Sequence, residues 1–283
     1  VGHMLGQGRQ PTWPIAITGP DHGSVLVELF GPAACGKTTL ARAVETALGA
    51  GGVPVRLVAS SRPQESGPTQ AQLAAVVTAP LSRAFKLFAA LGALTSPADP
   101  LERKLMEMIP PKGWMGQLRV RRYLRNLFRS WDAARKLRSV VIFDQGFMNA
   151  LCSMALYSDL VDREVMRKSI ALLPTPDVLV RVGTPRDILT TRLTKRLQRQ
   201  GPIERLFERK IEVALRQVEI FSQLDELLIA QGRSFLHVCG QDHEGLEKAV
   251  GTIVDEVFRR RESRRELASS RASSDRIFDL AGR

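Results

Sequence analysis

A glycine-rich stretch with a lysine and a threonine has the spacing of a loop that binds phosphate groups. Residues 31–39 read Gly-Pro-Ala-Ala-Cys-Gly-Lys-Thr-Thr and match the pattern G-x-x-x-x-G-K-[ST]. The glycines let the backbone turn tightly and bring its N–H groups inward around an anion. Lys37 can then reach the β- and γ-phosphates, and the Thr38 hydroxyl can bind Mg²⁺. We therefore expect a nucleoside triphosphate to contact Gly31, Ala33, Ala34, Cys35, Gly36, Lys37, Thr38 and Thr39.

The elements that must position this loop are present on both sides of it. Residues 24–30 are an apolar, β-rich run, and residues 39–48 are a good candidate for a helix. Strand, loop and helix follow in the order that places bound phosphates at a positive helix N-terminus. A chance glycine-rich turn is the alternative, and it would not require either flanking element.

A carboxylate follows a second buried-type strand. Asp144 comes directly after the apolar run 140–143, a pattern that resembles the second nucleotide-binding motif, Walker B. An acid at the carboxyl edge of a parallel strand faces the crevice where ligands bind in open α/β sheets. There it can hold Mg²⁺ or orient a nucleophile, so we assign Thr38 and Asp144 to the metal. The structural alternative is a turn-initiating aspartate before Gly146.

A cationic helix and two isolated charges complete the candidate groups. Within residues 185–200, cations recur at spacings that place them on one helix face. There they could neutralise the charge of a phosphoryl group or cover a bound nucleotide. The alternative is a helix face that is simply exposed to solvent. Arg62 follows the strand candidate 53–59 and would emerge at the ligand edge of a parallel sheet. Glu28 is a charge inside an apolar strand, for which we expect a structural ion pair. The cationic face consists of Arg192, Lys195, Arg196 and Arg199.

The order of the elements predicts an α/β fold. Apolar strand candidates alternate with helical segments along the chain, which indicates a parallel sheet covered by helices on both faces. The strand candidates are residues 24–30, 53–59, 139–143, 177–182 and 235–238; helices are expected in 39–48, 73–138, 147–157, 161–172, 185–200, 203–231 and from 242 to about 260. We divide the chain into an N-terminal arm with an expression scar (1–23), a main domain (24–260) and a flexible basic tail (261–283).

Composition and charge limit the class of protein. The 283 residues are 44% hydrophobic and 25% charged, as in globular proteins, and no apolar run reaches the roughly 18 residues of a membrane span. The three cysteines have neither disulfide-framework nor metal-ligand spacing, so we expect a cytoplasmic protein. The net charge of +12 comes from residues 102–138 and 259–283. Such charge fits nucleic acid, an anionic membrane, a polyanionic substrate or simply solvated helix faces.

Four features together resemble the P-loop kinases, most of all the thymidylate-kinase-like group. They are the loop at 31–39, the acid at 144, the sequence Thr184-Pro185…Arg192-Leu193…Arg196 and the short last strand. The resemblance covers residues 24–258. It implies a three-layer P-loop NTPase fold with a five-stranded parallel sheet, a helical lid, which we place at 185–202, and ATP·Mg as donor. We separately assign residues 80–138 as a basic helical acceptor region. By position, Arg192 would lie near the adenine, Arg196 near the transferring phosphate, and Arg62 near an acceptor phosphate.

Two departures from that family concern the acceptor. Thymidylate kinases carry Asp-Arg after the third strand, whereas this chain has Asp144-Gln145, and its basic stretch at 102–138 is longer than that family needs. Both features favour a divergent kinase with another acceptor.

We therefore expect an ATP-dependent phosphotransferase that acts on a small anionic acceptor, either a nucleotide or another hydroxyl or phosphate compound. The expected catalytic residues are Lys37, Asp144, Arg192 and Arg196, and Arg62, Arg122 and Gln145 are expected to contact the acceptor. A regulatory NTPase that acts through a partner is the alternative, although no Asn-Lys-x-Asp or Leu-Ser-Gly-Gly-Gln motif is present. A third reading, less favoured, is a nucleic-acid or membrane-surface binding module that keeps the loop for structure.

Overall fold

A parallel β-sheet forms the centre of the protein, for which a computed structural model describes residues 23–58, 99–158, 162–198, 204–240 and 242–281. The strands are β1 (Val25–Phe30), β2 (Val55–Val58), β3 (Val140–Phe143), β4 (Val178–Gly183) and β5 (Leu236–Cys239). They are ordered β2-β3-β1-β4-β5, and every pair is parallel. The predicted α/β class and the five parallel strands are thus confirmed.

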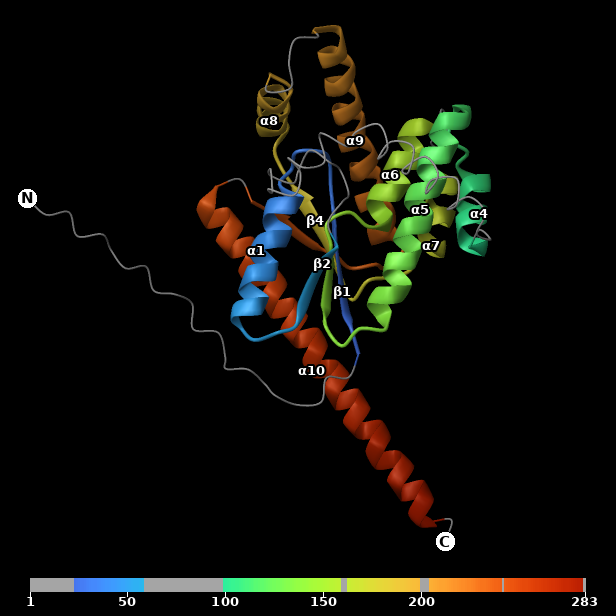
Figure 1. Ribbon diagram of the computed structural model, residues 1–283, viewed down its shortest axis with the longest axis vertical. Coiled ribbons are helices and arrows are strands. Elements are labelled where there is room, and N and C mark those ends of the chain that lie inside the picture. The colour runs from blue at the N-terminus through green and yellow to red at the C-terminus, as the bar shows by residue number, and fades with distance from the viewer. Residues whose placement is uncertain (1–22, 59–98, 159–161, 199–203, 241, 282–283) are drawn as a thin grey trace, which may run out of the picture.

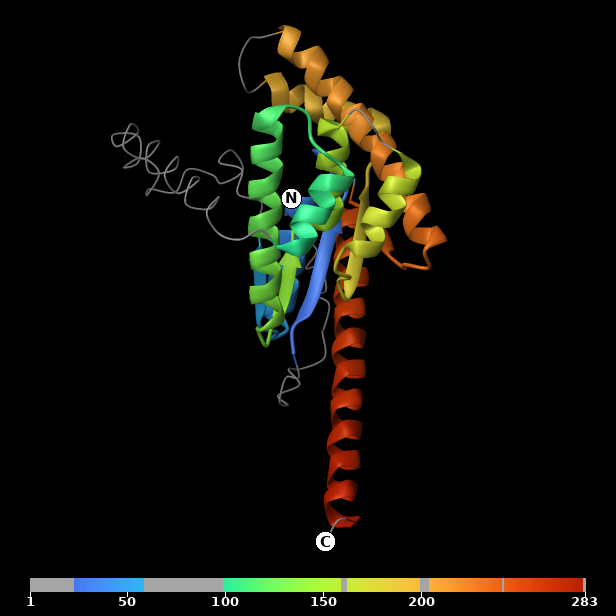
Figure 2. The same ribbon diagram turned by 90° about the vertical axis from the view of Figure 1, so that its right-hand side faces the viewer.

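Helices cover both faces of this sheet, which makes three layers (Figure 1). α1 and α10 lie on one side, and α5, α6 and α9 lie on the other; Figure 2 shows the pair α8 and α9 at the end of the molecule where the strands finish. The described helices are α1 (Lys37–Ala50), α4 (Pro100–Met108), α5 (Gly113–Arg135), α6 (Phe147–Tyr157), α7 (Arg163–Leu172), α8 (Arg186–Gln198), α9 (Glu204–Ala230) and α10 (His243–Ala281).

The alternation of side chains in β1 explains why the sheet has two cores. Leu26 and Phe30 point into the core beneath α5, α6 and α9, whereas Val27 and Leu29 point into the core beneath α1 and α10. All of these side chains are buried, as expected for a strand covered on both faces. β1 is therefore the rigid centre from which the loop after Phe30 emerges.

The last helix is longer than the sequence predicts. An end near Arg260 is expected, but α10 continues to Ala281, and its second half projects away from the sheet (Figures 1 and 2). Arg264 holds the middle of this helix to the body, because its guanidinium donates to the carbonyl oxygen of Ser24 and pairs with Asp177. Neither α10 nor any other helix in the described ranges combines the length and apolar character that a membrane crossing requires.

Glu28, for which an ion pair is expected, instead directs one carboxylate oxygen to a helix N-terminus, and its Oε2 has no hydrogen-bond partner among the described residues. Its fully buried carboxylate accepts a hydrogen bond from the Met148 main-chain N–H at 2.7 Å, in the first turn of α6, and the described residues give it no ion pair. The helix dipole favours a carboxylate there. Gly146 leaves room for it, since a Cβ at that position would lie 2.3 Å from the Glu28 Cδ. Burial raises the pKa of Glu28 to about 7, although the Met148 hydrogen bond and Arg233 oppose this rise.

We predict that Glu28→Gln flattens the pH dependence of stability. The wild-type carboxyl titrates at about 7 in the folded state against 4.5 ordinarily, so between these values the folded state binds more protons than the unfolded state. Stability should therefore fall by up to about 3 kcal/mol as the pH rises through this window, and level off above it. Urea unfolding at a series of pH values between about 4.5 and 7 measures the free energy of unfolding of both proteins. Glu219→Gln, which replaces an exposed acid, is the control. An unchanged pH profile in Glu28→Gln would refute this assignment.

Candidate functional site

The loop between β1 and α1 requires glycine at two positions. Gly31 has a φ of 151° and Gly36 a φ of 97°, both outside the range that L-residues favour, and Ala34 between them also has a positive φ of 63°. A Cβ on Gly31 would lie 2.6 Å from the Val182 carbonyl oxygen and 3.0 Å from Nη1 of Arg181. The loop therefore passes so close to β4 that no side chain fits at its first position.

We predict that Gly31→Ala lowers the free energy of unfolding by about 2 kcal/mol or more, because the methyl group meets main chain rather than a flexible side chain. Gly49→Ala is the matched control: it lies in α1, and a Cβ there meets nothing within 4 Å. That control should be neutral or slightly stabilising. Equal melting temperatures for the two variants would contradict the close approach of the loop at Gly31 to β4.

Lys37 places a buried ammonium group beneath this loop. The residue is 7% exposed, and its Nζ donates to the carbonyl oxygens of Gly31 at 2.8 Å and Pro32 at 2.7 Å, with the Cys35 Sγ at 3.6 Å. Each of these partners is neutral, and among the described residues no carboxylate forms an ion pair with Lys37. A buried charge with only dipoles around it is incompletely compensated.

The start of α1 adds to the same positive field. α1 begins at Lys37, its N-cap residue Gly36 has no side chain that could cap it, and no acid lies in its first turn. The first N–H groups of a helix have no intrahelical acceptor, so they and the helix dipole favour an anion at this end.

Thr38 and Asp144 lie together, as the sequence predicts. The Thr38 hydroxyl donates to Asp144 Oδ2 at 2.9 Å, although 106 positions separate the two residues. β1 and β3 are adjacent and parallel, so the residues after their carboxyl ends meet at one edge of the sheet. Across the described part of the chain, no group of three or more His, Cys, Asp or Glu side chains could hold a metal alone. Thr38 and Asp144 fit Mg²⁺ only if a ligand supplies further oxygens, which is the usual arrangement for this ion.

Two contacts that the sequence does not reveal hold the loop in place. The Ala33 N–H donates to Gln217 Oε1 of α9 at 3.0 Å, and the Thr184 hydroxyl donates to the Cys35 carbonyl oxygen at 3.1 Å. Gln217 lies 184 positions from its partner, and no local pattern marks it. These bonds connect the loop to the residue that follows β4 and to α9.

Arg181 supports the loop from below, and sequence reasoning missed it as well. Its guanidinium pairs with Asp225 of α9 at 2.9 Å and lies over the rings of Phe30 and Phe221, 5.6 and 5.2 Å from their centroids. Burial raises the pKa of Asp225, and Arg181 opposes that rise. The sequence does carry a signal for Arg181, because it is a charged residue within the apolar strand candidate 177–182. The same kind of signal identified Glu28.

A cavity of about 650 Å³ opens over the loop. It runs from the loop to the segment between β5 and α10, and it brings three cations, Lys37, Arg42 and Arg192, together with one carboxylate, Asp242. Gln145 lines it at the edge where β3 ends. Its full lining is Ala33, Ala34, Cys35, Gly36, Lys37, Thr38, Thr39, Leu40, Arg42, Gln145, Val182, Arg192, Gly240, Asp242, His243 and Leu246.

Most of the predicted site residues that the structure describes meet at this cavity, but not all. Arg122 is exposed on α5 and does not line the cavity. Gly31 and Asp144 are also absent from the lining, although Asp144 accepts a hydrogen bond from the lining residue Thr38. Arg62 lies outside the described residues, as does the side chain of Arg196 on α8. Arg42 and the residues at the start of α10 were not predicted, because only the fold brings them to the loop. No protein-family model and no curated protein matches this chain.

Proposed function

We propose that the protein is an ATP-dependent phosphotransferase of the P-loop kinase type, which transfers the γ-phosphoryl group of ATP·Mg to a small anionic acceptor. The observation that supports this most strongly is the Lys37 ammonium, buried among neutral acceptors beneath an uncapped helix N-terminus. A polyphosphate supplies the negative charge that this arrangement lacks.

The volume of the cavity and the residues at its two ends suit a nucleoside triphosphate. Its volume of about 650 Å³ lies within the usual range of small-molecule pockets. The phosphates would lie over the loop, and the base would lie toward Arg192 and the segment before α10. The adenine assignment of Arg192 rests on the resemblance to thymidylate-kinase-like proteins and on the place of this residue in the lining.

Thr38 and Asp144 are the residues that would hold the metal. Their two oxygen atoms, with phosphate oxygens and water, make the ligand set that Mg²⁺ prefers, and the ion supplies charge neutralisation to the phosphates. In this chain, Asp144 holds the carboxylate at the sheet edge, and Thr38 fixes the start of α1 beside it.

The chain's own residues then act by position and charge. Lys37 neutralises the β- and γ-phosphates, and α8 carries the lid residues Arg192 and Arg196. An acceptor oxygen forms the new bond to the γ-phosphorus as the bond to the bridging oxygen breaks, and the electron pair leaves with ADP. The acceptor enters at the Gln145 edge of the cavity. Such catalysis is mainly orientation and electrostatic stabilisation.

A thermal-shift screen of nucleotides and acceptors with Mg²⁺, followed by an assay of ADP formation, tests this proposal. A ligand that binds the folded state raises the melting temperature by mass action. We expect ATP·Mg to raise it and ADP formation to depend on one class of acceptor. ADP formation without an acceptor, increased by nucleic acid, would instead favour a regulatory or motor NTPase, and no shift with any nucleoside triphosphate would overturn the proposal.

A further inference from the structure

The outer surface of α4 and α5 carries a large excess of positive charge. Over residues 99–138, ten cationic side chains are exposed, whereas only two acids, Glu107 and Asp132, are exposed. Arg125 is not part of this excess, because it is buried in an ion pair with Glu102 of α4 at 3.2 Å. We call the following ten residues the basic surface: Arg103, Lys104, Lys112, Arg119, Arg121, Arg122, Arg129, Arg135, Lys136 and Arg138.

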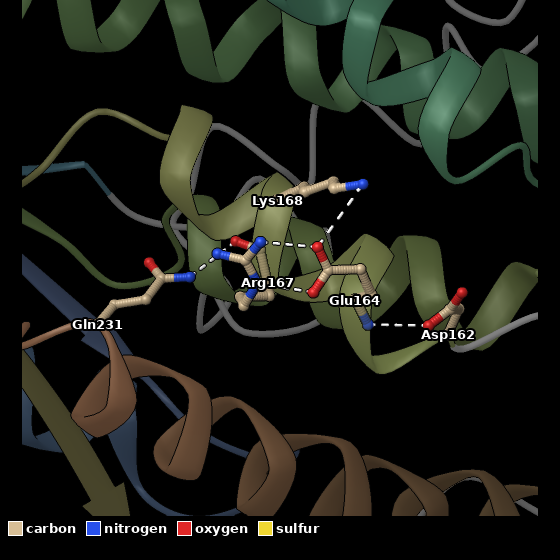
Figure 3. A network of polar contacts seen from close by, with 5 residues as sticks. All are labelled: Asp162, Glu164, Arg167, Lys168 and Gln231. Carbon is tan, nitrogen blue, oxygen red and sulfur yellow. Dashed lines mark hydrogen bonds and ion pairs between the residues drawn. The ribbon is translucent and has the colours of Figure 1, made fainter.

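Another helix of the same molecule shows how exposed cations can be balanced. On α7, Arg167 and Lys168 both contact Glu164, at 2.6 and 3.6 Å, and Figure 3 shows these side chains converging on the one carboxylate. Arg163, at the start of α7, pairs with Glu226 of α9 at 2.9 Å. The basic surface has ten exposed cations for two exposed acids, so a net positive charge remains on it whatever local contacts its side chains make.

The cations of α5 are arranged in a row. Arg122 and Arg129 of α5 and Lys136, the C-cap residue of this helix, follow one another at intervals of seven residues, which places them on one side of the helix at steps of about 10 Å. The opposite side of α5 is apolar and is packed into the core through Leu124, Leu127 and other side chains. The row therefore faces away from the sheet.

We propose that the basic surface binds the sugar–phosphate backbone of a single-stranded nucleic acid. All the cations within α5 itself are arginines, whose planar guanidinium groups bind phosphate oxygens in pairs and stack on bases. Trp114, at the start of the same helix, is 74% exposed and offers a ring on which a base can stack. Regularly spaced charge with an accessible aromatic ring is the usual construction of a groove for single strands.

A membrane surface fits the same charge less well. Peripheral helices insert an apolar face into the lipid, but the apolar face of α5 is already buried in the protein core. A membrane could therefore be bound only through attraction between its anionic lipids and the cations. Trp114 is the single large apolar side chain that the described part of α5 exposes for insertion.

The row begins beside the cavity. The Tyr123 hydroxyl donates to the Gly146 carbonyl oxygen at 3.5 Å, so this part of α5 lies against the turn that carries Gln145. A strand lying on the basic surface would thus have one end near the cavity. The binding itself does not require phosphotransfer, so this inference stands or falls independently of the proposed function.

Fluorescence anisotropy with labelled single-stranded DNA and RNA of about 20 nucleotides tests the proposal, over a series of salt concentrations. The full-length protein is compared with Arg122→Ser/Arg129→Ser/Lys136→Ser. The control, Arg163→Ser/Arg167→Ser/Lys168→Ser, removes the same charge from α7. Circular dichroism and melting temperature establish whether both triple variants are folded. If a triple variant is unfolded, its three single substitutions are measured in its place.

We expect the α5 variant to bind at least about tenfold more weakly and to lose about 2 from the slope of log K against log salt, since each phosphate contact on a single strand contributes about 0.7. The α7 control should keep both the affinity and the slope. The proposal is overturned if wild-type protein binds neither DNA nor RNA at low salt, if the two variants lose affinity equally, or if the α5 variant loses only binding to phosphatidylserine vesicles.

Discussion

Replacing Lys37 with alanine should reduce phosphotransfer by about 10²- to 10³-fold or more while leaving the fold intact. The ammonium is the charge closest to the expected phosphates, and water cannot replace it at a site where the residue is 7% exposed. The fold should survive because the hydrogen-bond partners of Nζ are neutral carbonyl oxygens and a thiol, so no opposite charge is left buried. The measurement is ADP formation with the acceptor identified by thermal shift.

The control for Lys37→Ala is Lys168→Ala, which removes an exposed ammonium from α7 and should keep full turnover. The melting temperatures of both variants should lie close to that of the wild type, and only the wild type and Lys168→Ala should be stabilised by ATP·Mg. Full phosphotransfer by folded Lys37→Ala would refute the role assigned to this lysine.

Replacing Asp144 with asparagine should reduce turnover by about 10²-fold and raise the Mg²⁺ concentration needed for half-maximal rate. The amide oxygen can still accept the hydrogen bond from Thr38, so the local geometry is kept and the negative charge is lost. Rates are measured over a range of Mg²⁺ concentrations at saturating ATP. Asp255→Asn, at an exposed position of α10 outside the cavity lining, is the matched control.

A change in turnover without a change in Mg²⁺ dependence would contradict the metal assignment of Asp144. It would instead indicate that this carboxylate orients the nucleophile, the second role that an acid at this edge can have. Equal behaviour of Asp144→Asn and Asp255→Asn would remove Asp144 from the site.

The strands and most helices could be predicted from sequence because short apolar runs end at proline, glycine or polar residues. The predicted strand 139–143 is observed as β3 (Val140–Phe143), and the predicted helix 147–157 is α6 itself. Parallel strands bring their carboxyl ends to one edge, so the contact between Thr38 and Asp144 followed from the order of the elements. These are consequences of local pattern and of one topological rule.

The remaining contacts of the site depend on packing between segments that are distant in sequence. Gln217 reaches Ala33 only because the fold brings α9 to the loop, and Arg42 and Asp242 share the cavity only because α1 and α10 pack side by side. Glu28 was identified as unusual, but its partner was not, since a main-chain N–H of α6 carries no mark in the sequence. Local patterns identify which groups need partners, and the fold decides which partners they obtain.

Calorimetric titration of the wild-type protein with ATP in the presence of Mg²⁺ tests the central claim most directly. We predict saturable binding of one nucleotide per chain, lost in Lys37→Ala, because in our proposal the amides of residues 31–38 and the Lys37 ammonium would surround a polyphosphate. Absence of measurable affinity for any purine nucleoside triphosphate in the folded wild-type protein would contradict it.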